Sequence, residues 1–321
     1  MKKTLIAAAA LLVAVAVLRA QQVNVDSIVD LELLTHTEVS QKLKDGWTSI
    51  LIAAGGTEER GPQDVLGGHT FMAHSHAMMI AKKLGKTLVA PTLPIAVNAT
   101  GLNANREMAD QPGAIQMPAD VFKQVHLAEV ESLYRSGFKD IYLMGDHGGG
   151  QQQLKETAEE MDAKLSPKGV RVYYVSDFYN KTHDDVDMYF YEHKLPIGGH
   201  GAMLETSIML YLEPHPGAWV RPNYKTVAFD PTGQTPEQWK AARDARIARE
   251  QAAKNGQPVP PAAAGGRGRG GDPNAPRVNN GVTGDPRPST KEIGKDLIDI
   301  IVNNGVNEIR KVTAERRGNT H

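Results

Sequence analysis

The chain has 321 residues, with 36 Lys or Arg against 37 Asp or Glu and a formal net charge of −1. This near balance gives no electrostatic reason to expect binding to nucleic acid or to an anionic membrane surface. The absence of cysteine excludes disulfides, thiolate metal ligands and a cysteine nucleophile. The length suffices for one large α/β domain or two small ones.

The first 20 residues have the pattern of a signal peptide. Two lysines precede the apolar run 5–18, and small or polar residues begin at Ala20. A basic start, a short apolar region and a small residue at the cut are typical of an exported chain, cleaved here after Ala20. An uncleaved membrane anchor is the alternative, although the apolar run is short for a full span. We therefore expect a periplasmic or secreted protein with no membrane contact after cleavage.

Short apolar runs alternate with amphipathic segments along the rest of the chain. The predicted strands are 50–54, 88–93, 140–144 and 170–175, and the predicted helices between and after them are 70–84, 119–137, 151–165, 201–212 and 289–302. Alternation of strand, loop and helix predicts an α/β fold with a parallel sheet and helices on both faces. A single domain, 21–321, accommodates all of these elements.

Residues 254–279 interrupt this domain after a charged helix at 235–253. Their Pro, Gly and Ala content leaves too little apolar surface to form a packed structure, so we interpret them as a disordered insertion. The two Arg-Gly pairs in this stretch are the sequence pattern of a nucleic-acid-binding tract, which is the less favoured interpretation.

Candidate functional residues follow the first predicted strand. After residues 50–54 comes a loop with two Gly-containing turns that carries Glu58, Glu59, Arg60, Asp64 and His69. Ligands in open α/β sheets bind at the carboxyl ends of the strands, so this loop is where chemistry is expected. An ordinary loop of solvated charges is the alternative.

Histidines and a carboxylate in other segments add to this loop. His147 comes directly after the predicted strand 140–144, and His200 lies just before a helix that contains Glu205. By contrast, His74 and His76 are two residues apart on the helix 70–84, so they point in different directions. A polar helix face is the favoured interpretation of that pair, with one of them facing the site as the alternative.

Together these residues suit a divalent metal ion. Glu58, His69 and His147 offer a carboxylate and two imidazoles, and Glu205 offers a second carboxylate. Such ligands suit zinc, manganese or iron(II) and leave coordination positions open for water and substrate.

Four motifs resemble those of the creatininase (creatinine amidohydrolase) family. Gly-Thr-Glu58-Glu-Arg60-Gly-Pro-Gln-Asp-Val-Leu-Gly-Gly-His69-Thr is similar to its signature Ser-Thr-Glu-x-His-Gly-Pro-His-Leu-Pro-Leu-Gly-Thr-Asp-Thr. The loop Gly-Asp-His147-Gly-Gly-Gly resembles Asn-Gly-His-Gly-Gly-Asn, and Gln111-Pro-Gly-Ala-Ile resembles Phe-Pro-Gly-Thr-Ile. His200-Gly-Ala-Met-Leu-Glu205-Thr-Ser resembles His-Ala-Gly-x-x-Glu-Thr-Ser. The motifs occur in the family's order.

The resemblance implies a three-layer α/β/α fold, a metal site at the carboxyl edge of the sheet and hydrolysis of a non-peptide amide. It also implies a homo-oligomer, since members of that family are often hexamers. Glu58 and His147 match metal ligands of the family, and Glu205 matches an acidic residue of the site. Arg60 stands where the family has a ligand histidine, and His69 where it has an aspartate that bridges two metals.

These two departures favour one ion per chain, held by Glu58, His69 and His147 with Glu205, because a guanidinium cannot ligate a metal. The leading hypothesis is a metal-dependent hydrolase of a small-molecule amide, cyclic amides included, with zinc as the first choice of metal. His200 or Glu205 would shuttle the proton, and Arg60 would stabilise developing negative charge. A non-catalytic metal- or ligand-binding protein on the same fold is the alternative.

Overall fold

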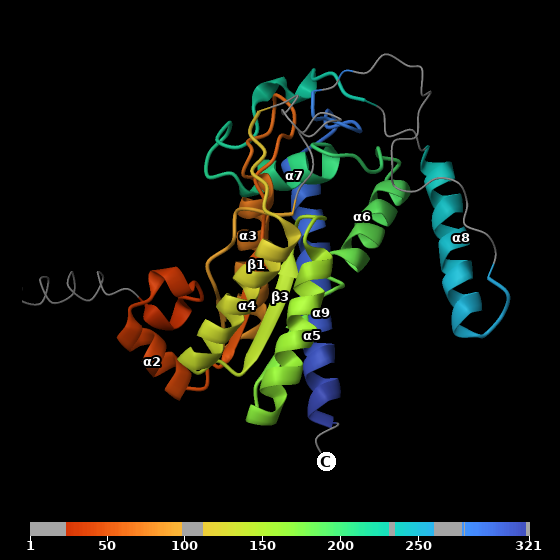
Figure 1. Ribbon diagram of the computed structural model, residues 1–321. Helices are drawn as coiled ribbons and strands as arrows, with labels where there is room; N and C mark the ends of the chain where they lie inside the picture. Colours follow the sequence, from red (N-terminus) through yellow and green to blue (C-terminus); the bar gives the residue numbers. More distant parts are fainter. Residues whose placement is uncertain (1–23, 98–111, 231–234, 260–277, 279, 319–321) are drawn as a thin grey trace, which may run out of the picture.

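A four-stranded parallel sheet lies at the centre of the molecule (Figure 1). The computed structural model describes residues 24–97, 112–230, 235–259, 278 and 280–318. Within them the strand order is β2-β1-β3-β4. The strands are β1 (Ser49–Ala54), β2 (Thr87–Val89), β3 (Asp140–Gly145) and β4 (Arg171–Tyr174).

Alternation along the strands divides the core into two clusters. Ile50 and Ile52 of β1 contribute to one cluster, and Leu51 and Ala53 contribute to the other. Because neighbouring side chains of a strand point to opposite faces, both faces of this sheet are buried. The near-continuous apolar strands of the sequence follow from this double burial.

Helices cover both faces of the sheet. On one face lie α4 (Ala119–Ser136) and α5 (Gln151–Leu165), and on the other α3 (Gly68–Leu84) and α9 (Lys291–Gly318) (Figure 1). α7 (Met203–Leu212) packs against α9 and α3 at the upper end of that second layer. The predicted three-layer α/β/α fold is therefore confirmed.

The remaining elements lie around this body. They are α2 (His36–Lys44), α6 (Asn180–Glu192), α8 (Pro236–Lys254) and the short 3-10 helices Val25–Ser27, Leu31–Leu33, Ser166–Lys168 and Pro222–Lys225. α8 stands at the side of α6 in Figure 1. Trp239 fixes the two helices together, since its indole N–H donates to Asp187 Oδ2 at 3.2 Å.

One prediction about the elements was wrong, and one helix was missed. The last helix does not end at Val302 but continues to Gly318, and nothing in the sequence analysis predicts α6. The sequence Asn303-Asn304-Gly305 has the composition of a helix end, yet Gly305 lies within the helix where a Cβ would come 2.6 Å from Ile80 Cδ1 of α3. This glycine allows close helix packing instead of terminating the helix.

The predicted signal peptide lies outside the described residues, and so does most of the predicted insertion, 260–277 and 279. The described part of the insertion comprises the end of α8 and residues 255–259 and 278. Over the residues that the structure describes, no helix is both long and apolar enough to cross a membrane.

Candidate metal centre

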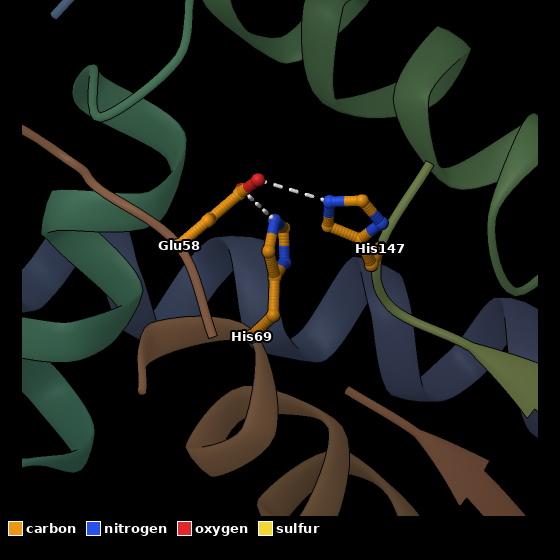
Figure 2. A group of neighbouring side chains, drawn as sticks. All are labelled: Glu58, His69 and His147. Atoms are coloured by element: carbon orange, nitrogen blue, oxygen red, sulfur yellow. Dashed lines mark hydrogen bonds and ion pairs between the residues drawn. The ribbon is translucent and has the colours of Figure 1, made fainter. Parts of the chain in front are cut away.

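Three side chains from different segments converge at the carboxyl edge of the sheet. Glu58 lies in the loop after β1, His69 in the first turn of α3, and His147 directly after β3. One potential ligand atom from each lies within 4.8 Å of the others (Figure 2). β1 and β3 pair in register up to Ala54 and Gly145, so the loops that follow them begin side by side.

A glycine after β1 brings Glu58 close to His69. A Cβ on Gly55 would lie 2.5 Å from the Cα of Thr70, so only glycine lets the chain pass the first turn of α3 at this distance. The backbone N–H of Glu58 then donates to the Leu66 carbonyl at 3.1 Å, which holds the two ends of the loop together. This local folding places the carboxylate over the helix.

The Glu58 carboxylate connects the two histidines. Oε1 lies 3.0 Å from His69 Nε2, and Oε2 lies 3.0 Å from His147 Nε2 (Figure 2). Burial raises the pKa of Glu58, but hydrogen bonds from His147 and His69 outweigh burial and hold the pKa well below its usual range. Glu58 therefore offers an ionised carboxylate at physiological pH.

Asp146 orients His69 from behind. Its Oδ2 lies 2.7 Å from His69 Nδ1, and its backbone N–H donates to the Ala54 carbonyl at 3.0 Å. Burial and the positive charge of Arg60 lower the pKa of His69, but hydrogen bonds to Asp146 and Glu58 raise it to about 9. With Nδ1–H donated to Asp146, His69 presents Nε2 to a metal in the carboxylate–histidine–metal arrangement common in zinc proteins.

The tautomer of His147 is set by Gly149. His147 Nδ1 lies 3.1 Å from the Gly149 carbonyl and 2.9 Å from its backbone nitrogen. Because the Gly149 N–H donates to Nδ1, the proton of a neutral His147 lies on Nε2, which donates it to Glu58 Oε2 at 3.0 Å. A metal ion on Nε2 would move this proton to Nδ1, where the Gly149 carbonyl can accept it. The donor set Glu58, His69 and His147 thus fits a divalent ion of the zinc or manganese type.

Arg60 and Glu205 lie against these ligands. The Arg60 side chain is fully buried, with Nη2 3.1 Å from Glu58 Oε1 and Nη1 2.7 Å from Glu205 Oε2. Glu205 Oε2 also accepts from the Gly201 backbone N–H at 2.7 Å, whereas Oε1 lies 3.9 Å from His69 Nε2. Burial raises the pKa of Glu205, but the charges of Arg60, His200 and His69 bring it below its ordinary value.

His200 is the most accessible member of the group, with 29% of its side chain exposed. Its Nε2 lies 2.7 Å from the Glu59 carbonyl, which can only accept, so Nε2 carries the proton. Nδ1 then faces Glu58 Oε1 at 3.6 Å. Thr283 holds the loop, since its Oγ1 accepts from the His200 backbone N–H at 2.9 Å and its own N–H donates to the His200 carbonyl at 2.9 Å.

All of the residues proposed for the site from the sequence are thus brought together, but the sequence assigned no role to Asp146. For His76 the favoured polar-face interpretation was wrong and the alternative is closer, since His76 is fully buried with Nδ1 3.5 Å from Asp146 Oδ1. A usable signal existed for Asp146. It stands where the resembling motif has glycine, while His69 stands where that motif has aspartate, and the two departures form one pair.

The fold and the site define a three-layer α/β protein with a carboxylate–histidine cluster at the strand ends that could hold a divalent metal ion. The family model for creatinine amidohydrolase matches residues 32–309. The chain therefore belongs to the creatininase family, a family of metal-dependent amidohydrolases. Among curated proteins, none matches this sequence significantly.

Solved creatininase structures share the fold. A crystal structure of creatinine amidohydrolase has a TM-score of 0.62 at 17% identity, with 88% of this chain and 97% of that chain covered. A manganese creatininase has a TM-score of 0.62 at 17% identity, with 88% of this chain and 98% of that chain covered. A mutant creatininase of zinc–zinc type has a TM-score of 0.61 at 17% identity, with the same coverage of both chains. At this identity the likeness shows the architecture alone.

Proposed function

We propose that the chain hydrolyses the C–N bond of a small, non-peptide amide, cyclic amides included, with one divalent ion per chain. The observation that carries this proposal is the convergence of Glu58, His69 and His147 within 4.8 Å at the strand ends. When bound, a divalent ion lowers the pKa of a coordinated water and polarises a carbonyl. Zinc is the first candidate and manganese the second, since the fold neighbours include structures with each.

The chain's own residues divide the remaining tasks. His200 Nδ1 is the accessible base, because the Glu59 carbonyl fixes the proton on Nε2 and leaves the Nδ1 lone pair facing the centre. Once protonated, His200 is stabilised by Glu58 Oε1 at 3.6 Å, so it can pass the proton on to a leaving nitrogen. Glu205 Oε1 is the second candidate for proton transfer, since Oε2 is engaged by Arg60 and Gly201.

The burial of the ligands supports a small substrate. Side chains of Glu58, His69 and His147 are only 2%, 9% and 10% exposed. A compact amide can approach such a centre through the side on which His200 is exposed, whereas a folded polypeptide cannot. The neighbours described as creatinine amidohydrolases act on a small molecule of this kind.

The test combines metal analysis with a substrate panel. Protein loaded with Zn²⁺ or Mn²⁺ is assayed against cyclic and linear amides for release of carboxylate or amine. His69→Ala and His147→Ala should lower metal affinity by more than about 100-fold, since even outer partners of ligands are worth 10–100-fold. The matched control is His74→Ala, because His74 lies on the same helix and pairs with Asp30 at 3.3 Å, outside the centre.

His200→Gln separates catalysis from metal binding. It should lower kcat by about 10²–10⁴-fold with metal content unchanged, as expected for loss of a proton-transfer group. Unchanged metal content in His147→Ala would overturn the ligand assignment. A fully loaded protein that hydrolyses none of the panel would favour the alternative, a metal- or ligand-binding protein on the same fold.

A further inference from the structure

Arg60 has the surroundings of a cation site. Its guanidinium lies between two carboxylates, with Nη2 3.1 Å from Glu58 Oε1 and Nη1 2.7 Å from Glu205 Oε2, and none of its side chain is exposed. A buried carboxylate pair requires a positive charge between its members, because desolvated like charges repel strongly. Here a side chain provides that charge.

The surrounding chain makes room for Arg60, Gly68 beside its guanidinium and Gly201 beside its backbone. A Cβ on Gly68 would lie 2.9 Å from Arg60 Nε, and a Cβ on Gly201 would lie 2.9 Å from the Arg60 carbonyl. Two glycines from distant segments therefore border the arginine closely. Such close packing fixes the position of Arg60, unlike that of an arginine at the protein surface.

A second metal ion does not fit the same residues. Arg60 has only N–H donors and no lone pair for a metal. His69 can give one nitrogen only, because its Nδ1 is bonded to Asp146 at 2.7 Å. An ion between Glu58 and Glu205 would occupy the place that the guanidinium fills.

The sign of the charge points the same way. The guanidinium already supplies a fixed positive charge between Glu58 and Glu205, so a divalent ion brought against it would be repelled at short range in a buried centre. One of the fold neighbours is described as a zinc–zinc type, so the arginine marks a difference within the family.

We infer that Arg60 is a built-in cation that takes the place of a second metal ion, so that the centre holds one ion and keeps its two carboxylates together when no metal is bound. This inference rests on the proposed function for its first ion only. Arg60 is then a positioning residue, because its two terminal nitrogens lie against Glu58 and Glu205. Its stabilisation of developing negative charge stays a prediction from the sequence.

The experiment compares metal-free and metal-loaded melting temperatures for the wild type, Arg60→Met and Arg171→Met. Arg171 is the matched control, since it makes a bidentate ion pair with Asp162 outside the centre. Its Nε and Nη2 donate to the two carboxylate oxygens at 2.9 and 3.0 Å. Metal-free Arg60→Met should melt about 10 °C below the wild type, because it removes the cation nearest to Glu205 and leaves His69, 3.0 Å from Glu58 Oε1 and 3.9 Å from Glu205 Oε1, to balance both carboxylates. Added Zn²⁺ should raise its melting temperature more than that of the wild type or of Arg171→Met.

The second measurement is the number of Zn²⁺ ions bound per chain, determined by plasma mass spectrometry. The wild type should hold about one Zn²⁺ per chain and Arg60→His about two. Two ions in the wild type, or equal stabilisation by Zn²⁺ in all three proteins, would overturn the inference. If Arg60→Met does not fold, Arg60→Lys replaces it: the charge is kept, so one ion per chain is expected, and two would contradict it.

The outcomes also separate this inference from the proposed function. A wild type that binds no ion would contradict the function, and the metal-free melting temperatures would then decide the role of Arg60 alone. A wild type that binds two ions would contradict the inference and the one-ion count of the proposed function, while metal-dependent hydrolysis of an amide would still stand.

Discussion

Asp64 is a buried carboxyl group near the centre but outside the ligand set. It accepts a hydrogen bond from Thr206 Oγ1 at 2.8 Å and another from Gln63 Nε2 at 3.4 Å. Burial raises the pKa of Asp64 to about 7, although the Thr206 bond and the charge of Arg60 act against it. The folded chain therefore holds a proton on this group that the unfolded chain has already released above its ordinary pKa of 3.8.

Because the folded state binds that proton more tightly, Asp64 makes the free energy of unfolding fall as the pH rises from about 4 to about 7. Asp64→Asn keeps the shape and removes the titration. As the pH rises from 5 to 8, the free energy of unfolding of metal-free Asp64→Asn should increase by about 2–4 kcal/mol relative to that of the metal-free wild type. Urea unfolding at both pH values in the presence of a chelator measures the difference, and parallel pH dependences would contradict the assignment.

The sequence predicted the ligands better than their partners. Glu58 and His147 were identifiable because each comes just after an apolar strand, and strand ends meet at one edge of a parallel sheet. The contacts of Arg60 with Glu205, and of His69 with Asp146, join residues 145 and 77 positions apart. No local pattern encodes such side-chain contacts, so they could only be seen in the folded chain.

At the scale of elements, the crossing of α7 and α9 fixes the position of Glu205. A Cβ on Gly294 of α9 would lie 2.0 Å from the Ser207 carbonyl of α7, so the backbones meet at this glycine. The helix that carries Glu205 is therefore held by direct backbone packing against α9.

Gly294→Ala should destabilise the protein by about 2–3 kcal/mol, because the added methyl group meets a backbone atom that cannot move away. Gly305→Ala is the matched control on the same helix. Its Cβ would meet the flexible end of Ile80, and alanine favours a helix over glycine by about 1 kcal/mol, so the change in stability should be small. Equal effects of the two substitutions, measured by urea unfolding, would contradict this account of the crossing.

Most elements could be predicted from the sequence, but the end of α9 could not. Strands and most helices followed from the alternation of apolar runs, because both faces of the sheet are buried. The end of α9 was missed because the glycine at 305, placed after two asparagines, has the composition of a helix terminus. Here tertiary packing against α3 decides, and it overrides local composition.

At the scale of the whole molecule, export remains a prediction that the N-terminal sequence supports. The packed body is described from Asn24 onward, and the family match begins at residue 32. Cleavage after Ala20 should therefore remove nothing that the described body needs. Protein recovered from the producing cell should begin near Gln21 by N-terminal sequencing, and a chain expressed from Gln21 should keep the melting temperature and metal content of that protein.

A mature chain that still begins at Met1 would contradict the export prediction. The homo-oligomer and the disordered insertion also stay predictions.

The packing of α9 has a consequence for when the candidate metal centre can form. This helix is synthesised after α3, which carries His69, and after α7, which carries Glu205, and it supports both of them. The two side chains therefore reach their places only after α9 has been synthesised. If the chain is exported before it folds, the ion is acquired in the receiving compartment. The metal that the protein contains then reflects the supply outside the cytoplasm.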